Sequence, residues 1–261
     1  MSGISDHGLG GEALKCLEQM QCEGIVGNSV TFVCGMKACG SIRARNKGKT
    51  IHALIDSLGL SGRKDIIVGN ALLDMYSKCG LLDFAQAVFD KLQARDVVSW
   101  TTLIDGYTEY GQGDSAIKCY EQMRLENVTP NLITFVCGLK ACGSIGITDK
   151  GIKIHSEIER KGCLPETNIV LGNALLDMYV TVGLLENAQK VFDVMATRDV
   201  ISWTALIGGH AKQGHGKQAL KYFEEMLIQG IRPNVVTYVC SLIACSSSGD
   251  IERGENIHAE V

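Results

Sequence analysis

The chain repeats itself with a period of 103 residues. The octapeptide "GNALLDMY" occurs at residues 69–76 and again, unchanged, at residues 172–179. The stretch "TFVCGMKACGSI" from Thr31 returns with one substitution from Thr134, and a weaker match begins one period later at Thr237. A repeat of this regularity restricts the fold to architectures that stack one kind of structural unit many times.

The composition predicts that this unit is helical. Only three of the 261 residues are proline and 46% are hydrophobic, with Leu, Ala, Glu and Lys abundant. Eleven cysteines, an odd count in a long chain, favour a reducing compartment over a disulfide scaffold. The longest apolar stretch, around residues 235–245, is far shorter than the roughly 20 residues that span a bilayer. We therefore expect no membrane partner.

Each period divides into three helical hairpins. In residues 97–131, an apolar stripe containing Leu103, Ile104 and Tyr107 precedes Gly111, which predicts a helix stop, and a second apolar stripe follows. Pro130 then marks a turn. The three hairpins are 35, 37 and 31 residues long. Because helices of about a dozen residues are marginal alone, we expect the hairpins to stack into an α-solenoid.

The hairpins at residues 97–131 ("VVSWTTLIDGYTEYGQGDSAIKCYEQMRLENVTPN") and 200–234 resemble pentatricopeptide repeats. The order of lengths is similar to that of the plant PLS subclass, in which P-type, long L-type and short S-type repeats rotate. The resemblance implies an all-α fold, a right-handed α-solenoid superhelix of stacked helix-turn-helix hairpins, as one array over residues 1–261. Its units would be a partial P-type unit at 1–28, L-type units at 29–65 and 132–168, S-type units at 66–96 and 169–199, P-type units at 97–131 and 200–234, and a partial L-type unit at 235–261.

The resemblance implies that the chain binds single-stranded RNA with one base facing each repeat. In the family, the fifth and the last residue of a repeat contact the base edge, and the second residue wedges between neighbouring bases. The S-type pairs, similar to uracil readers, are Asn70 with Asp96 and Asn173 with Asp199. The P-type pairs, similar to adenine readers, are Thr101 with Asn131 and Thr204 with Asn234. The wedge positions are Ile67, Val98, Val170 and Ile201.

The implied target is 5'-U-A-N-U-A-3', because RNA runs parallel to the repeats in this family. The position N faces an L-type unit, where the fifth residue is Val136, as it is Val33 and Val239 in the other L-type units. A valine offers no hydrogen bond to a base edge, so we expect no selectivity there. In the family, L-type repeats are also implicated in docking organellar RNA-editing cofactor proteins.

Simpler roles remain open for these residues. Asn70 and Asn173 stand in predicted helices although Asn is a poorer helix former than Ala by roughly 0.5 kcal/mol, which favours a role beyond helix stability. The last residue of each unit is also a good helix N-cap, and capping can coexist with base contact. The wedge residues could equally pack between hairpins.

Enzyme chemistry is the weakest alternative. The sequence His155-Ser156-Glu157 matches the first half of a zinc deaminase signature, but the Cys-x-x-Cys half is absent. Pairs such as Cys137 and Cys142 are five residues apart, so on one helix they point about 140° apart and cannot easily share a metal. We expect no catalytic residue, no metal and no cofactor, and we expect the cysteines, the periodic histidines and both tryptophans to pack structurally.

The resemblance also suggests partners and a location. Arrays of the PLS type resemble the site-recognition part of organellar C-to-U RNA-editing factors, which implies a mitochondrion or a chloroplast, although no transit peptide is recognisable in this sequence. The uncapped ends of the array offer surfaces for dimerisation. The net charge of −4 argues against nonspecific nucleic-acid binding. The alternative is a tetratricopeptide-like scaffold for proteins or peptides, whose uniform 34-residue period differs from the pattern here.

Overall fold

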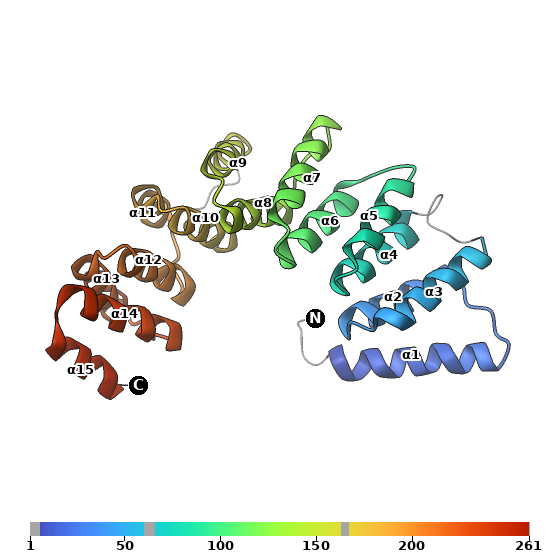
Figure 1. Ribbon diagram of the computed structural model, residues 1–261, viewed down its shortest axis with the longest axis horizontal. Helices are drawn as coiled ribbons and strands as arrows, with labels where there is room; N and C mark the ends of the chain where they lie inside the picture. The colour runs from blue at the N-terminus through green and yellow to red at the C-terminus, as the bar shows by residue number, and fades with distance from the viewer. Residues whose placement is uncertain (1–5, 60–65, 163–166, 261) are drawn as a thin grey trace. The chain divides into compact units, whose positions relative to one another are not determined.

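The computed structural model describes residues 6–59, 66–162 and 167–260, and this part of the chain is entirely helical (Figure 1). The helices are α1 (Asp6–Cys22), α2 (Ser29–Ser41), α3 (Arg45–Ser57), α4 (Ile66–Lys78), α5 (Leu82–Lys91), α6 (Val97–Glu109), α7 (Gly113–Leu125), α8 (Leu132–Ile145), α9 (Thr148–Arg160), α10 (Ile169–Thr181), α11 (Leu185–Val194), α12 (Val200–Lys212), α13 (Gly216–Ile228), α14 (Val235–Ser248) and α15 (Ile251–Glu260). The predicted all-α fold is therefore confirmed.

The chain forms two compact units, residues 1–137 and 138–261, whose boundary falls within α8. In the first unit α2 packs against α4 and α4 against α6; in the second unit α10 packs against α12 and α12 against α14. Consecutive helices form hairpins, such as α4 with α5 and α12 with α13 (Figure 1). Within each unit, the first helices of successive hairpins therefore form one continuous layer.

The first helices begin where the sequence places the start of each hairpin. Helices α2, α4, α6, α8, α10, α12 and α14 begin at residues 29, 66, 97, 132, 169, 200 and 235. The turn after α6 shows how a hairpin closes: Gly111 has a φ of 72°, and the N–H of Gln112 donates to the carbonyl of Tyr107 at 2.8 Å. A residue with a side chain is strained at such a φ, so glycine is favoured there.

The two tryptophans lie in the hairpin cores, as predicted. Trp100 is buried with its ring edge against Phe89, at 4.5 Å between centroids, and Trp203 meets Phe192 in the same way at 4.7 Å. Aromatic pairs in this geometry stabilise by about 0.5–1.5 kcal/mol beyond the area that they bury. Each pair joins the second helix of a short hairpin to the first helix of the next.

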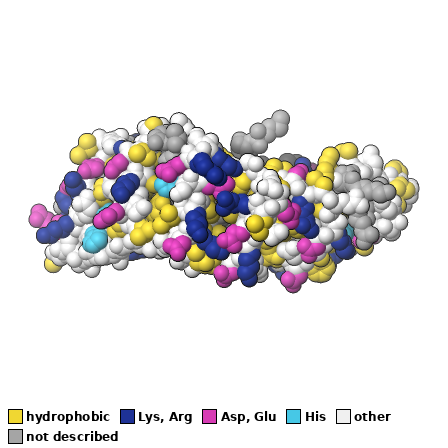
Figure 2. All heavy atoms as spheres, turned by 90° about the horizontal axis from the view of Figure 1, so that it is seen from above, with side chains coloured by type: hydrophobic (Ala, Val, Ile, Leu, Met, Phe, Trp, Pro, Cys, Tyr) yellow, Lys and Arg dark blue, Asp and Glu magenta, His cyan; other side chains and the backbone are white. Residues whose placement is uncertain are grey.

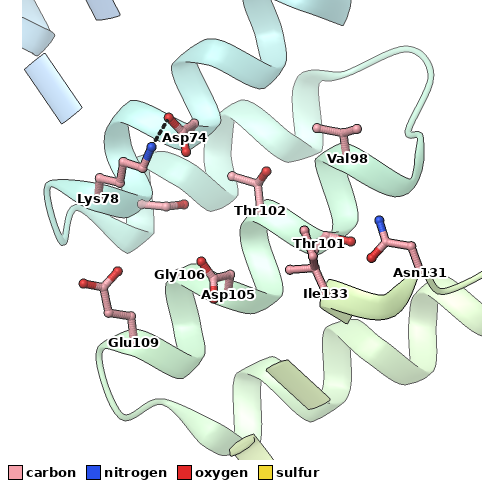
Figure 3. A pocket seen from close by; sticks show the side chains of 11 residues that line it. Asp74, Lys78, Val98, Thr101, Thr102, Asp105, Gly106, Glu109, Asn131 and Ile133 are labelled. Carbon is pink, nitrogen blue, oxygen red and sulfur yellow. Dashed lines mark hydrogen bonds and ion pairs between the residues drawn. The ribbon is translucent and has the colours of Figure 1, made fainter. Parts of the chain in front are cut away.

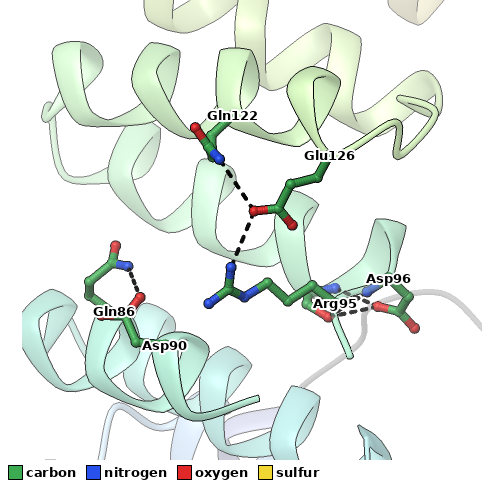
Figure 4. A network of polar contacts seen from close by, with 7 residues as sticks. Gln86, Asp90, Arg95, Asp96, Gln122 and Glu126 are labelled. Atoms are coloured by element: carbon green, nitrogen blue, oxygen red, sulfur yellow. Dashed lines mark hydrogen bonds and ion pairs between the residues drawn. The ribbon is translucent and has the colours of Figure 1, made fainter. Parts of the chain in front are cut away.

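Arg95, which precedes Asp96, stabilises the junction between α5 and α6 through a network of polar contacts (Figure 4). The Arg95 guanidinium lies over the Phe89 ring, 4.7 Å from its centroid, and donates to Glu126 at 3.2 Å. Gln122 donates to the same carboxylate at 3.4 Å. The chain entering α6 is therefore held from two sides, which fixes the position of Asp96.

None of the described helices combines the length and the apolar character needed to cross a bilayer.

Candidate functional site

The last residue of each predicted S-type and P-type unit caps the next helix. Asp96 accepts from the N–H of Ser99 at 2.8 Å and Asn131 from the N–H of Thr134 at 2.9 Å. Asp199 and Asn234 cap α12 and α14 in the same way, each as part of a capping box. The capping alternative is therefore present at all four positions. Each cap nevertheless keeps side-chain atoms available to solvent, because all four residues are exposed or half-buried.

In the short hairpins, the fifth residue contacts the cap directly. The Asn70 amide donates to Asp96 at 3.3 Å, and the Asn173 amide donates to Asp199 at 3.2 Å. The Asn173 carbonyl also accepts from the Ser202 hydroxyl at 2.6 Å, whereas the Asn70 carbonyl has no protein partner among the described residues. The two predicted pairs of the S-type units are therefore physically paired.

In the 35-residue hairpins, the fifth residue reaches the cap through a third residue. The hydroxyl groups of Thr101 and Thr134 are 2.6 Å apart, and Thr134 in turn donates to Asn131 at 2.9 Å. Thr204 and Thr237 are paired identically at 2.6 Å. Thr101 is only 7% exposed, so its hydroxyl is less accessible than the sequence suggests. Thr134 and Thr237 were not recognised from the sequence as members of these sites.

The two aspartate caps are held in the charged form. Burial raises the pKa of Asp96, but hydrogen bonds from the Ser99 backbone and side chain and from Asn70 outweigh it, so the pKa lies below its ordinary value. Asp199 has a lowered pKa for the same reasons, with burial opposed by Ser202 and Asn173. Each short hairpin therefore offers a carboxylate acceptor beside an amide.

The wedge residues are exposed. Ile67, Val98, Val170 and Ile201 are between 50% and 67% exposed. Packing between hairpins does not account for side chains in this state, because core packing would remove them from water. An exposed apolar side chain at the second position of each first helix remains available to contact the face of a base.

A cavity of about 230 Å³ lies beside α6 and is lined by Val98, Thr101 and Asn131 of one predicted unit (Figure 3). Its other apolar wall is Ile133, the second residue of the following hairpin. One pocket thus gathers a wedge residue, a fifth residue and a last residue, with a further exposed apolar side chain facing it from α8.

The second unit holds the corresponding cavity, of about 590 Å³, beside α12. It is lined by Ile201, Thr204 and Asn234, with Val236 as the counterpart of Ile133. Sequence reasoning assigned no role to Ile133 or Val236, because the valine at the fifth position of the L-type units removed those units from consideration. Their place as the second residue after the N-cap, which is the wedge position in the other units, was the signal that could have found them.

The L-type units offer little polar chemistry at their fifth residue. Val239 is 51% exposed and Val33 and Val136 are half-buried, and the lack of base selectivity at these positions stays a prediction. The periodic histidines differ among themselves. His52 and His155 each hydrogen-bond a tyrosine hydroxyl at 2.7 Å, which confirms a structural role, whereas His258 is exposed and its predicted packing is not seen.

Nothing in the described part of the chain assembles into a metal centre. Among these residues, no three His, Cys, Asp or Glu side chains are arranged to hold a metal ion. Cys39 and Cys142 are fully buried, as expected for small core residues, whereas Cys34 is exposed and its predicted packing is not seen. Burial raises the pKa of the Cys39 thiol to about 11. A thiol in that state is a poor nucleophile and a poor metal ligand.

Sequence comparison relates the chain to repeat proteins. The PPR repeat family matches residues 95–144 and 198–247, and a second description, PPR repeat, matches residues 1–25, 70–97 and 173–200. One pentatricopeptide repeat-containing protein of Arabidopsis thaliana is 37% identical over 254 residues, which are 97% of this chain and 34% of that protein. Another, named as mitochondrial, is 38% identical over 224 residues, 86% of this chain and 35% of that protein.

Among solved structures, the pentatricopeptide repeat protein PPR10 from maize matches with a TM-score of 0.67 at 21% identity, over 98% of this chain and 38% of that one. PPR10 in complex with an 18-nt psaJ RNA element matches with a TM-score of 0.62, over all of this chain and 44% of that one. The chain spans 30% to 44% of the length of the curated relatives that it matches. Repeat matches, relatives and fold agree, and the chain belongs to the pentatricopeptide repeat (PPR) family.

Proposed function

We propose that this chain binds single-stranded RNA, with one base facing each hairpin and the target 5'-U-A-N-U-A-3'. The observation that carries the proposal is the recurrence, one period apart, of a pocket that joins an exposed wedge residue, a polar fifth residue and a polar cap. PPR10, which shares this fold, has been solved in complex with an RNA element, which supports the same class of ligand here.

The chemistry of the pairs suits base edges. An amide carries both a donor and an acceptor, and uracil presents both on its pairing edge. The Asn70 carbonyl oxygen is buried and has no protein partner among the described residues, whereas the Asp96 carboxylate is half-buried and held charged, so Asp96 is the acceptor that this pair offers to a base N–H. The wrong base would leave one of these groups unpaired, and that penalty is the source of selectivity.

We expect the attraction for RNA phosphate to come from basic side chains close to the bound strand and not from the net charge of the chain. On the face drawn in Figure 2, basic and acidic side chains are interspersed rather than gathered in one basic stripe, in keeping with the net charge of −4. Four read bases at roughly 1–3 kcal/mol each give a gross gain of about 4–12 kcal/mol. Ordering the strand reduces this gain, and micromolar binding corresponds to about −8 kcal/mol, so we expect weak to micromolar affinity.

We assign the chain to the PLS subclass because its hairpins follow one another with lengths of 35, 37 and 31 residues. We infer that it is the site-recognition part of an organellar C-to-U RNA-editing factor, with its L-type hairpins docking editing cofactor proteins and its open ends available to a second copy. Relatives named as mitochondrial and chloroplastic support an organellar location. No chemical step is assigned to the chain itself.

The direct test is binding of the purified chain to a short RNA that contains UANUA and to a scrambled RNA of the same composition. We expect at least about a tenfold preference for UANUA, since one mismatched base costs about 1–3 kcal/mol. Equal affinity for the two RNAs would remove the sequence-reading proposal.

A double substitution tests the assignment of bases to hairpins. Thr101→Asn with Asn131→Asp gives the hairpin at residues 97–131 the pair found at Asn70 and Asp96, and should change its preference from adenine to uracil. Thr204→Asn with Asn234→Asp is the matched control, because it should change only the other adenine position. A preference that stays at adenine in both variants would show that these residues do not read the base.

A further inference from the structure

The two pockets are built from the same positions of the repeat. Each of the 11 residues that line the cavity beside α6 has its counterpart, 103 positions later, in the lining of the cavity beside α12. Asn131 corresponds to Asn234 and Thr101 to Thr204, so both pockets carry the same predicted adenine-reading pair. By the fifth and last residues alone, the two sites are equivalent.

The two pockets differ in the side chains that follow the fifth residue along α6 and α12. Where α6 has Asp105 and Glu109, α12 has Gly208 and Lys212. The first pocket measures about 230 Å³ and the second about 590 Å³. The second pocket has no counterpart of the Asp105 side chain in its wall and also extends to Gly183, Gln213 and Cys240. The two acidic side chains follow one face of α6 below Thr101 (Figure 3).

The acidic charge of the first pocket is only partly balanced. Its lining contains the carboxylates of Asp74, Asp105 and Glu109 and one cation, Lys78. That lysine is already paired with Asp74 at 2.9 Å, and Glu109 is paired with Arg43 at 2.8 Å in an exposed ion pair. The Asp105 carboxylate accepts from the Cys137 thiol, a weak donor, at 3.1 Å, and no ion pair of Asp105 is found among the described residues.

The second pocket has no such excess. Its lining contains one carboxylate, Asp177, and one cation, Lys212. Gly208 faces Cys240, the counterpart of Cys137, and a Cβ added at Gly208 would lie 3.1 Å from the Cys240 sulfur. The site thus lacks the carboxylate that occupies this place in the first pocket.

We propose that Asp105 and Glu109 weaken the binding of RNA at the first pocket by repelling its phosphates, so that the second pocket anchors the strand although both carry the same base-reading pair. This inference rests on the proposed RNA binding. A base enters a pocket together with its charged phosphodiester, so carboxylates along the same helix face disfavour the bound state in every sequence. The repulsion must weaken as salt screens it.

The test compares three double variants by the affinity for UANUA RNA at ~50 mM and ~500 mM salt. Asp105→Asn with Glu109→Gln removes the two charges without changing side-chain size. Asp83→Asn with Asp114→Asn makes the same change in net charge at exposed positions on α5 and α7 that line neither pocket. Gly208→Asp with Lys212→Glu gives the second pocket the acidic pattern of the first.

We expect D105N/E109Q to tighten binding about three- to tenfold at low salt and less than about twofold at high salt. D83N/D114N should change affinity by less than about twofold, and G208D/K212E should weaken it about tenfold or more. Lys212→Glu alone should weaken binding in the same direction if the glycine substitution prevents folding.

This experiment distinguishes a failure of the proposed RNA binding from a failure of the inference about Asp105 and Glu109. If the unmodified chain does not distinguish UANUA from scrambled RNA, the proposed function is wrong. If it does distinguish them, but D105N/E109Q and D83N/D114N behave alike, the two acidic residues do not control the first pocket and the inference is overturned.

Discussion

The short hairpins and the 35-residue hairpins differ in how the fifth residue meets the helix cap. In the short hairpin at residues 66–96, the Asn70 amide donates directly to Asp96 at 3.3 Å. In the 35-residue hairpin that follows, Thr101 contacts Thr134, and only Thr134 contacts Asn131. The second unit repeats both arrangements.

The difference teaches that each proposed base-reading site is a group of three residues. The third member is the third residue of the next first helix, namely Ser99, Thr134, Ser202 or Thr237. It completes the capping box in each case. The polar groups of a site are therefore oriented only when the following hairpin is packed in place. In the short hairpins this third residue supports a direct pair, whereas in the 35-residue hairpins it is the link itself.

The largest expected effect comes from removing that link. Thr134→Val deletes the hydroxyl that pairs with the buried Thr101 hydroxyl and with the Asn131 N–H, so two polar groups lose their partner. We expect a loss of about 1–3 kcal/mol in the free energy of unfolding, measured by urea denaturation.

The matched change in the short hairpin is Ser99→Ala. It removes the acceptor of the Asp96 N–H but leaves the Asp96 carboxylate with the backbone N–H of Ser99 and with Asn70, so we expect a loss of about 1 kcal/mol or less. Equal losses in the two variants would contradict the distinction between a direct and a linked pair.

An intermediate effect is expected from placing charge in the direct pair. Asn70→Asp sets a second carboxylate against Asp96, and two carboxylates in hydrogen-bond range cannot both ionise without cost. We expect a loss of about 1 kcal/mol in the free energy of unfolding at pH 7, which is recovered as the pH falls toward about 4 and one of the two is protonated.

Asn131→Asp provides the comparison in the linked pair. Its neighbours in the network are the neutral Thr134 and Thr101, and Asp caps a helix as well as Asn does. We expect a change within about 0.5 kcal/mol at pH 7. A loss as large as that of Asn70→Asp would show that the cap of the 35-residue hairpin is as sensitive to an added negative charge as the cap of the short hairpin.

The sequence predicts the local parts of these sites and not their connections. Hairpin starts, the glycine turn at Gly111 and the capping by Asp96 follow from spacing and residue type, since each depends on neighbours a few positions away. The contact between Thr101 and Thr134 spans 33 residues and depends on how the first helices pack. The burial of Thr101 has the same origin.

The pocket walls were missed for a related reason. Ile133 and Val236 line the two cavities as parts of the following hairpin. Treating each repeat as a separate reader of one base leaves no place for a neighbour's side chain. The acidic difference at Asp105 was likewise hidden, because comparing only the fifth and last residues makes the two 35-residue hairpins appear the same.

The smallest expected effect concerns the attachment of each hairpin to the one before it. The first helix of each short hairpin is joined to the preceding hairpin by a histidine hydrogen bond: His52 pairs with Tyr76, and His155 pairs with Tyr179. In the 35-residue hairpin of the first unit, the corresponding contact is neutral, with Tyr107 donating to Gln86 at 2.9 Å. The histidine contacts of the short hairpins should therefore weaken when the rings are protonated, whereas the contact of Tyr107 with Gln86 should not.

The direction follows from the lowered pKa of both histidines. Burial lowers the pKa of His52 and of His155, and the neighbouring acids Asp56 and Glu159 oppose this only in part. The unfolded chain then binds more protons than the folded chain as the pH falls below about 6.5. The stability that the neutral rings provide is present above that pH and is lost progressively below it.

Denaturation at pH 7.5 and 5.5 measures this loss, with His52→Gln and His155→Gln combined as the test variant. Glutamine keeps a partner for the tyrosine hydroxyl but carries no titrating group, so the variant should lose less stability on acidification than the unmodified chain.

His210, whose pKa is lowered first by burial and then by His215, is present in both proteins and cancels in the comparison. His258→Gln, at an exposed position, is the control and should leave the pH dependence unchanged. An identical pH dependence in the test variant would mean that the tyrosine contacts hold the short hairpins equally well with a charged ring, and the two kinds of hairpin would then not differ in this respect.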